Sequence, residues 1–264
     1  MLGGFPCKKT APLKLPKPPA RASEQFLGTI AQGMWAEEKL IEAINSHPQL
    51  RAIKYGQSRY NHDLISSKEA WREYVNRVYS QMRLYGKRPD VLVFKKEDIQ
   101  QALPQNIQDI SEKNEEEIKD IVFKSIAGIE CRSSSYYYKN YVQARRRELS
   151  ITVKQEDIDR LIKWRDTYCG SKPLFYLQLF FDKGFCISFD KILQIIKQAG
   201  RGVRVQGYRY EVDRKTGKPT HFISLSHASE CLIAVEHPVV DAVSIKAWDG
   251  KIYAIRSPKG GKFK

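Results

Sequence analysis

The stretch GIECRSSSYYY, residues 128–138, sets a glutamate and an arginine two positions apart in an apolar setting. Its first residues have the character of a buried β-strand, with a glycine and an isoleucine before Glu130. Because alternate side chains of a strand point to the same face, Glu130 and Arg132 share one side of it. Two interpretations follow. The pair forms a salt bridge at a strand end, or it is half of a metal-binding site whose other carboxylate lies upstream.

An upstream carboxylate of the right kind is Asp90, in the stretch RPDVLVF, residues 88–94. Asp90 opens an apolar run that is typical of a short strand. Metal-assisted hydrolysis of a phosphodiester needs two acidic groups that share a divalent cation, and a cationic side chain that stabilises the developing charge. Asp90, Glu130 and Arg132 would supply this set if their strands were neighbours. The alternative is that Asp90 caps its strand and Glu130 pairs with Arg132 at the surface.

Hydrophobic periodicity predicts helices and strands that alternate over the first three quarters of the chain, which indicates an α/β core. Helices are expected at residues 24–46, 66–84, 116–126, 155–168 and 189–199. The first of these has Met34, Leu40, Ile41 and Ile44 at helical spacing. Strands are expected at residues 90–94, 129–133, 148–154, 173–181 and 184–189. From residue 200 the pattern changes to period two on either side of a glycine-containing turn, which predicts a hairpin over residues 203–225 and further short strands.

Charge is unevenly distributed along the 264 residues, whose formal net charge is +15. Residues 1–25 and residues 256–264 are strongly basic, whereas residues 97–120, the acidic segment, hold eight acids and two lysines. A chain that is basic over most of its length favours a polyanionic partner, although a generically basic protein is the simpler alternative. We expect a flexible arm rich in proline and lysine at residues 1–22, a core at residues 23–199, and a basic β-rich region at residues 200–264.

Five cysteines form no CxxC pair, and their odd number argues against a disulfide framework. The first residues lack the apolar run of a signal peptide, and no stretch approaches the roughly 20 apolar residues of a membrane-spanning helix. The expected location is therefore the cytoplasm, with no membrane partner.

The motifs, taken in order, resemble the PD-(D/E)xK nucleases. Pro89 and Asp90 match the PD pair, Glu130 matches the second acid, and Arg132 stands where that pattern has lysine. Over residues 66–196, the runs RPDVLVF, GIECRSSS, ITVKQED and YLQLFFDKGFCISFDKIL are similar to the AccI-type group of type II restriction endonucleases.

This resemblance implies a restriction-endonuclease-like core, in which a mixed central sheet is flanked by helices. It implies a type II restriction endonuclease that binds Mg²⁺ through Asp90 and Glu130 and hydrolyses double-stranded DNA at a specific sequence. It also implies a homodimer on a palindromic site, and a DNA methyltransferase that acts on the same site without having to bind the enzyme. The alternatives are a non-catalytic nucleic-acid-binding protein and a structure-specific repair or junction nuclease.

The arginine in the lysine position leaves the catalytic cation open. Arginine stays protonated and cannot act as a general base, but it can stabilise charge on a phosphate. Lys154, at the end of the strand that follows, is the second candidate, and Arg132 is favoured by its position. Many such nucleases add a glutamate from the helix before the first core strand, and Glu37 is the candidate for that role, with an ordinary helix-flank glutamate as the alternative.

The remaining basic residues divide between the predicted hairpin and the region just after Glu130. A two-stranded ribbon fits the major groove of DNA, where arginine can pair with guanine through two hydrogen bonds. The hairpin candidates for DNA binding are Arg201, Arg204, Arg209, Arg214, Lys215 and Lys218. A solvated basic hairpin is the alternative. Lys139 and Arg145 could hold the DNA backbone near the cut.

Overall fold

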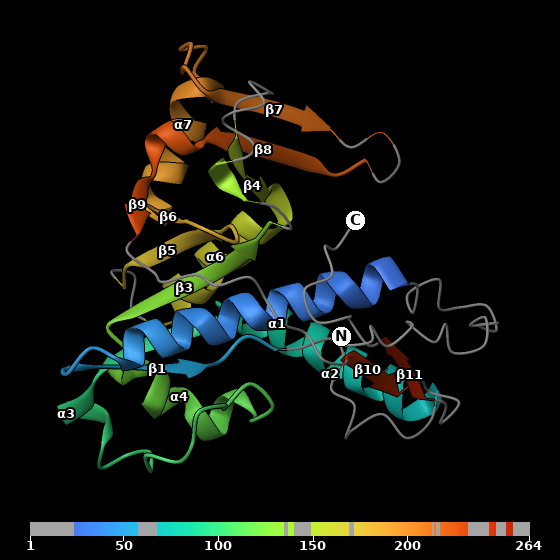
Figure 1. Cartoon of the computed structure of the whole chain (residues 1–264), viewed down its shortest axis with the longest axis vertical. Helices are drawn as coiled ribbons and strands as arrows, with labels where there is room; N and C mark the ends of the chain where they lie inside the picture. The colour runs from blue at the N-terminus through green and yellow to red at the C-terminus, as the bar shows by residue number, and fades with distance from the viewer. Residues whose placement is uncertain are drawn as a thin grey trace, which may run out of the picture.

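The computed structural model describes residues 24–57, 68–134, 137–139, 149–168, 172–212, 214, 217–231, 243–246 and 252–255. The predicted arm at residues 1–22 and the basic end at residues 256–264 lie outside this part of the chain. The helices are α1 (Glu24–Asn45), α2 (Lys68–Tyr85), α3 (Lys96–Ile99), α4 (Glu115–Lys124), α6 (Gln155–Thr167), α7 (Phe189–Gly200) and the 3-10 turn η2 (Leu225–His227). Figure 1 shows how they surround the strands.

Six strands form a central sheet in the order β1-β2-β3-β5-β6-β9. Their bounds are β1 (Leu50–Lys54), β2 (Val91–Lys95), β3 (Ala127–Ser133), β5 (Leu174–Leu179), β6 (Gly184–Ser188) and β9 (Ser229–Cys231). β3 and β5 are parallel, and every other neighbouring pair is antiparallel. The prediction of an α/β fold with a mixed central sheet flanked by helices is therefore confirmed.

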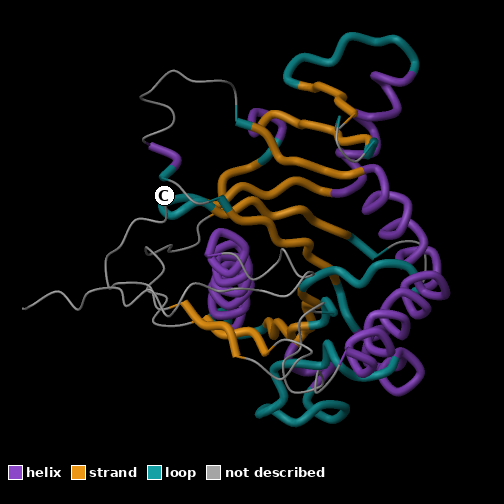
Figure 2. The backbone as a smooth tube through the Cα atoms, turned by 90° about the vertical axis from the view of Figure 1, so that its right-hand side faces the viewer, coloured by secondary structure: helices purple, strands orange, loops and turns teal. Residues whose placement is uncertain are grey.

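Each face of this sheet is covered by its own hydrophobic core. On one face α1 packs Trp35 against Val91 and Leu177. On the other face Leu92 and Tyr176 belong to a larger core that includes side chains of α4, α6 and α7. Figure 2 shows one helix end-on at one side of the strands and most of the other helices at the opposite side. Because alternate residues of β2 and β5 enter different cores, these strands are apolar along both faces, as in strands buried on both sides.

The buried side of α1 and the strand β1 differ from what the sequence predicts. Met34, which helical spacing places with Leu40 on the apolar face of α1, is 45% exposed, so the prediction for Met34 was wrong, whereas Leu40 is buried together with Trp35 and Ala36. β1 was not predicted, because Arg51 interrupts its apolar pattern. The Arg51 side chain is nevertheless buried, since its guanidinium donates to backbone carbonyls, among them those of Leu103, Pro104 and Ile107.

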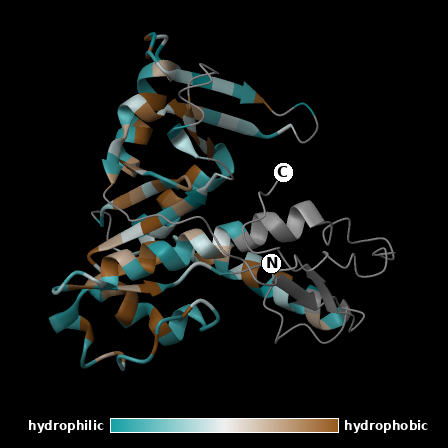
Figure 3. Cartoon of the chain, in the orientation of Figure 1, coloured by the Kyte–Doolittle hydropathy of each residue, from teal (hydrophilic) through white to brown (hydrophobic). Residues whose placement is uncertain are grey.

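A separate three-stranded sheet has the order β4-β8-β7, with β4 (Ser150–Lys154), β7 (Tyr208–Val212) and β8 (Pro219–Ser224). The β7–β8 hairpin agrees with the predicted one, and Figure 3 shows that β7 is mostly hydrophilic. β4 pairs with β8 and so leaves the central sheet. The buried His221 lies on β8, the middle strand of the three-stranded sheet, with hydrogen bonds of 2.9 Å to the Tyr208 hydroxyl and 2.7 Å to Gln155 Oε1. A short antiparallel pair, β10 (Val243–Lys246) and β11 (Ile252–Ile255), contacts α1.

Within the described residues, no helix has both the length and the apolar character needed to cross a membrane.

The turn between α2 and β2 approaches α6 so closely that it requires glycine. Gly86 has a φ of +86°, and a Cβ at this position would lie 2.2 Å from Trp164 N and 2.4 Å from the Arg160 carbonyl oxygen. The next amide, Lys87 N–H, donates to that same carbonyl at 3.0 Å. The turn is thus attached to α6 through the backbone, and this close approach is possible because Gly86 has no Cβ.

We predict that Gly86→Ala destabilises the protein by roughly 3 kcal/mol or more, because it combines an unfavourable positive φ with backbone overlap. Gly202→Ala is the matched control, since Gly202 has a φ of +79° and a Cβ added there would meet nothing within 4 Å. The control should lose only about 1–2 kcal/mol, the cost of the backbone conformation alone. Urea unfolding of both variants measures the difference, and equal losses would contradict the close approach.

Candidate active site

Asp90 and Glu130 lie on neighbouring strands and are joined through the backbone. β2 and β3 are antiparallel with Val91 opposite Ile129, which brings Asp90 beside Glu130. The Cys131 N–H donates to Asp90 Oδ2 at 2.7 Å. The Asp90 carbonyl in turn accepts from the amides of Tyr55 and Gly56, at 2.9 and 3.0 Å. Both ends of the aspartate are therefore held in place, and the two predicted acidic residues converge.

The glycine and proline of the two motifs allow the strands to meet in this way. Pro89 packs directly over Gly128, where an added Cβ would lie 2.8 Å from Pro89 Cγ and 2.7 Å from Leu174 Cδ2. A larger residue at position 128 would push the Pro89–Asp90 segment away from β3. The close approach of Pro89 and Leu174 thus explains why glycine occupies position 128 of β3.

The two oxygens of the Glu130 carboxylate have different surroundings. The residue is 0% exposed, and its Oε1 contacts the Lys87 ammonium and lies 2.9 Å from Arg132 Nη2. Asp157 holds the same two cations from the other side: its carboxylate lies 2.9 Å from Arg132 Nη2 and 3.8 Å from Lys87 Nζ. Glu130 Oε2 is buried and has no hydrogen-bond partner among the described residues. A buried carboxylate oxygen in this state is a ready ligand for a cation.

Lys87 and Asp157 were not identified from the sequence. Lys87 stands three residues before Asp90 in the turn after α2, and Asp157 lies in the first turn of α6. Neither residue belongs to a recognisable motif, and lysine and aspartate are frequent in this chain. Only the folded arrangement, which joins the turn, β3 and the start of α6, brings them to Glu130.

The electrostatic environment of Asp90 opposes its ionisation. Burial, followed by the negative charge of Glu130, raises the pKa of Asp90 to about 8, although Lys87 and Arg132 act in the opposite direction. Asp157 behaves differently. Its burial would raise the pKa, but Lys87 and Arg132 outweigh that effect and hold the pKa below its usual value. The cations are therefore committed to Asp157 and to one oxygen of Glu130, and Asp90 lacks a sufficient positive partner.

These residues fit a Mg²⁺ ion. Within the part of the chain that the structure describes, no group of three or more His, Cys, Asp or Glu side chains is arranged to hold a metal. Mg²⁺ does not need such a group, because it is commonly bound by one or two carboxylates, water and substrate phosphates. Asp90 and the unpartnered Glu130 Oε2 are a pair of this kind.

Glu37 reaches the same region from α1, as the sequence suggested. Its side chain is 23% exposed and pairs with Lys54, at the end of β1, over 3.3 Å. Burial is the main cause that raises the pKa of Glu37, and Glu130 is among the negative groups that add to the effect. Glu37 also raises the pKa of Asp90. Glu37 is thus within electrostatic range of both acids, while its direct partner is a lysine.

Lys154 lies farther from the pair of acids than Arg132 does. It ends β4, in the second sheet, and its side chain is exposed. Among the described residues its ammonium forms no ion pair with Asp90 or Glu130, although it helps to lower the pKa of Asp157. Of the two cations proposed from the sequence, Arg132 is the one that touches Glu130.

The basic residues of the hairpin region are exposed, and some have acidic partners. Arg209 pairs with Glu211 at 2.7 Å and lies over the Phe222 ring, and Lys218 pairs with Glu156 at 2.8 Å. The other exposed residues of this set are Arg201, Arg204 and Arg214. Lys139, in the segment after β3, is exposed and lies over the Tyr137 ring. Lys215 and Arg145 lie outside the described residues.

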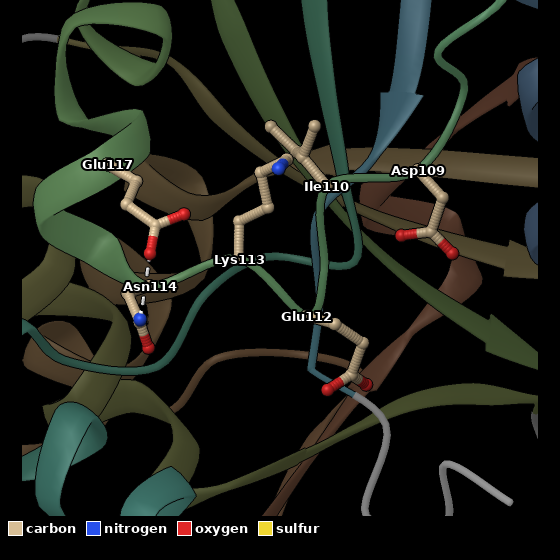
Figure 4. A pocket seen from close by; sticks show the side chains of 6 residues that line it. All are labelled: Asp109, Ile110, Glu112, Lys113, Asn114 and Glu117. Carbon is tan, nitrogen blue, oxygen red and sulfur yellow. Dashed lines mark hydrogen bonds between the residues drawn. The ribbon is translucent and has the colours of Figure 1, made fainter. Parts of the chain in front are cut away.

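An open pocket of about 440 Å³ lies in the acidic segment, and none of the site residues predicted from the sequence lines it. Figure 4 shows its six residues, Asp109, Ile110, Glu112, Lys113, Asn114 and Glu117. Asn114 donates to Glu117 at 2.8 Å. The pocket contains neither Asp90 nor Glu130, so the candidate site is defined by the contacts between the strands and not by a cavity.

Comparison with known families identifies a match over nearly the whole chain. The family model described as AccI restriction endonuclease matches residues 8–148 and 142–263, which include every site residue predicted from the sequence. No curated protein and no solved structure matches the chain.

The raised pKa of Asp90 predicts a specific dependence of stability on pH. An unfolded aspartate has a pKa near 3.9, so between pH 4 and 8 the folded protein binds a proton that the unfolded chain has released. The free energy of unfolding should therefore fall as pH rises through this window, by up to about 1.4 kcal/mol per pH unit, without further loss above pH 8.

Asp90→Asn should remove this contribution, so urea unfolding should show the variant gaining stability relative to the wild type as pH rises from 5 to 8. Asp98→Asn, at an exposed position of α3, is the control and should follow the wild-type pH profile. Parallel profiles for the wild type and Asp90→Asn would show that Asp90 is ionised at neutral pH.

Proposed function

The chain belongs to the AccI restriction endonuclease family, and we propose on this premise that it hydrolyses double-stranded DNA at a specific sequence in a Mg²⁺-dependent reaction. The observation that carries the proposal is the hydrogen bond from Cys131 N–H to Asp90 Oδ2, because it joins the two acidic motifs. The order of Pro89-Asp90 and Glu130 supports a PD-(D/E)xK nuclease whose lysine position is occupied by Arg132.

In this proposal Asp90 and Glu130 hold the metal ion. A bound Mg²⁺ would polarise the scissile phosphate and lower the pKa of a coordinated water. Glu130 offers Oε2 for this purpose, since Lys87 and Arg132 occupy Oε1. Arg132 is held at the same carboxylate, from which its guanidinium can stabilise negative charge on a phosphate. Glu37 and Lys154 are accessory candidates for the same reaction.

Asp90 must be ionised to act as a ligand. With its pKa near 8, the metal has to displace a proton at neutral pH. The Mg²⁺ concentration that supports half-maximal cleavage should accordingly be lower at pH 8 than at pH 7. The same raised pKa keeps the two acids from repelling each other in the absence of a cation.

We further propose a division of labour along the chain. Residues 23–199 form a restriction-endonuclease-like core, and residues 200–264 form a basic region that contacts DNA with the β7–β8 hairpin. The exposed arginines of the hairpin region support this assignment. A homodimer on a palindromic site, and a DNA methyltransferase that protects the same sequence, are proposed from the family and not from contacts within this chain.

The metal site is tested by Asp90→Asn and Glu130→Gln, which keep the size of each side chain. Both should reduce plasmid cleavage in Mg²⁺ by at least about 100-fold, because each removes a charged metal ligand. DNA affinity in Ca²⁺ should change little, since lysine and arginine contacts to phosphates supply most of it.

Glu116→Gln is the control, because Glu116 is an exposed residue of α4 whose partners among the described residues are surface groups, and it should cut like the wild type. If either site variant cuts within tenfold of the wild type, the assignment is wrong. The wild type itself separates the functions: discrete fragments indicate a restriction enzyme, a smear indicates a nonspecific nuclease, and intact plasmid indicates a DNA-binding protein.

The hairpin is tested by Arg204→Ala. If Arg204 pairs with guanine, the variant should lose roughly 1–3 kcal/mol of discrimination between cognate and non-cognate DNA. Binding of both DNAs in Ca²⁺ at several salt concentrations measures this. An equal loss for both, with a log–log salt slope shallower by about 0.9, would mean that Arg204 contacts only a phosphate.

A further inference from the structure

We propose that Lys87 supplies the catalytic amine, in the role that the general pattern gives to the lysine two residues after the glutamate. The assignment rests on the proposed nuclease function and concerns a residue outside both sequence motifs. In the folded protein the amine comes from the turn before β2, whereas the position on β3 is filled by Arg132.

The position of the Lys87 ammonium carries the proposal. It contacts Glu130 Oε1, the oxygen next to the one that is free to bind a metal, and it lies 3.8 Å from Asp157 Oδ1. Its side chain is 19% exposed, so it lies at the edge of the protein and can meet a ligand. Lys154, the alternative amine, is exposed and has no such contact to Glu130 among the described residues.

The backbone on both sides of Lys87 is fixed, as precise placement of an amine requires. On one side Gly86 lies against α6, and Lys87 N–H donates to the Arg160 carbonyl at 3.0 Å. On the other side the buried Arg88 side chain donates to Glu115 at 2.5 Å and to the Ser111 carbonyl at 2.9 Å. A side chain anchored in this way loses little further freedom when a substrate binds.

The chemistry needs a compact donor at this place. During hydrolysis the oxygen of a water molecule forms a bond to phosphorus and a proton of the water passes to solvent, while the bond to the leaving oxygen breaks and that oxygen takes up a proton from solvent. Negative charge develops on the attacking oxygen and on the phosphate. Lys87 has three rotatable N–H donors, one of which is used by Glu130, so another can point at the attacking oxygen. Arg132 has the fixed fork of a guanidinium, with Nη2 shared between Glu130 and Asp157.

The decisive variant is Lys87→Met, which keeps the length of the side chain without its charge. Its single-turnover cleavage rate in Mg²⁺ should fall by at least about 100-fold, while its DNA affinity in Ca²⁺ should stay within about threefold of the wild type. Lys119→Met is the matched control, because Lys119 is an exposed residue of α4 that pairs with the exposed Glu116, and it should leave the rate unchanged. Lys154→Met tests the alternative amine: a loss of at least about 100-fold in this variant, with Lys87→Met cutting within tenfold of the wild type, would give the role to Lys154 and overturn the assignment of Lys87.

Two further measurements distinguish chemistry from a merely structural contact. In Lys87→Ala, added ethylammonium should restore cleavage, whereas tetramethylammonium, which has no N–H donor, should not. In the double variant Lys87→Met/Arg132→Lys, which moves the amine to β3, the rate should rise at least about tenfold above that of Lys87→Met. Should Lys87→Met fail to fold, Lys87→Gln, which keeps one donor for Glu130, takes its place.

The outcomes separate this assignment from the proposed function. If the wild type cuts DNA and Lys87→Met cuts within tenfold of it, only the assignment of Lys87 is overturned. Loss of cleavage in Lys87→Met without rescue by either route would also overturn it, because the residue would then act through the fold. A wild-type protein that leaves DNA intact in Mg²⁺ would overturn the nuclease function, and the assignment with it.

Discussion

The buried carboxylate of Glu130 is the charge around which the candidate site is arranged. Burying such a charge is costly unless cations and hydrogen bonds compensate for it. Here the compensating cations are Lys87, from the turn after α2, and Arg132, from β3. Asp157 of α6 pairs with both cations and holds them beside Glu130. These contacts join the turn, the strand and the helix around the buried Glu130.

A second buried carboxylate fixes the same turn from its other side. Glu115 accepts from Arg88 and from the hydroxyls of Tyr55 and Tyr168, and the Trp164 indole donates to Tyr55 at 3.0 Å. Lys87 and Arg88 are consecutive residues that neutralise two different buried acids. One acid belongs to the candidate site and the other to the α6 side of the core, so the segment that leads to Asp90 is held at two successive positions.

The sequence was informative wherever a local pattern determines structure. The longer helices, most strands and the β7–β8 hairpin follow from periodicity, and the pairing of Asp90 with Glu130 follows from two motifs in neighbouring apolar strands. It failed where a contact between distant residues overrides a local pattern. β1 contains a buried arginine that is satisfied by carbonyls more than fifty residues away, so its strand pattern is hidden. Lys87 and Asp157 become site residues only where the turn after α2, β3 and α6 meet, and no spacing in the sequence indicates that contact.

The first turn of α6 serves two neighbours at once. Gln155 binds His221 of β8, Glu156 binds Lys218 in the turn between β7 and β8, and Asp157 holds the cations beside Glu130. These three residues are consecutive and belong to one hydrogen-bonded helical turn, which is stiff on the scale of a side-chain contact. The first turn of α6 therefore couples the position of the hairpin to the charges around Glu130. A ligand that displaces the hairpin therefore either breaks the contacts of the hairpin with this turn, or moves Asp157 and the two cations relative to Glu130.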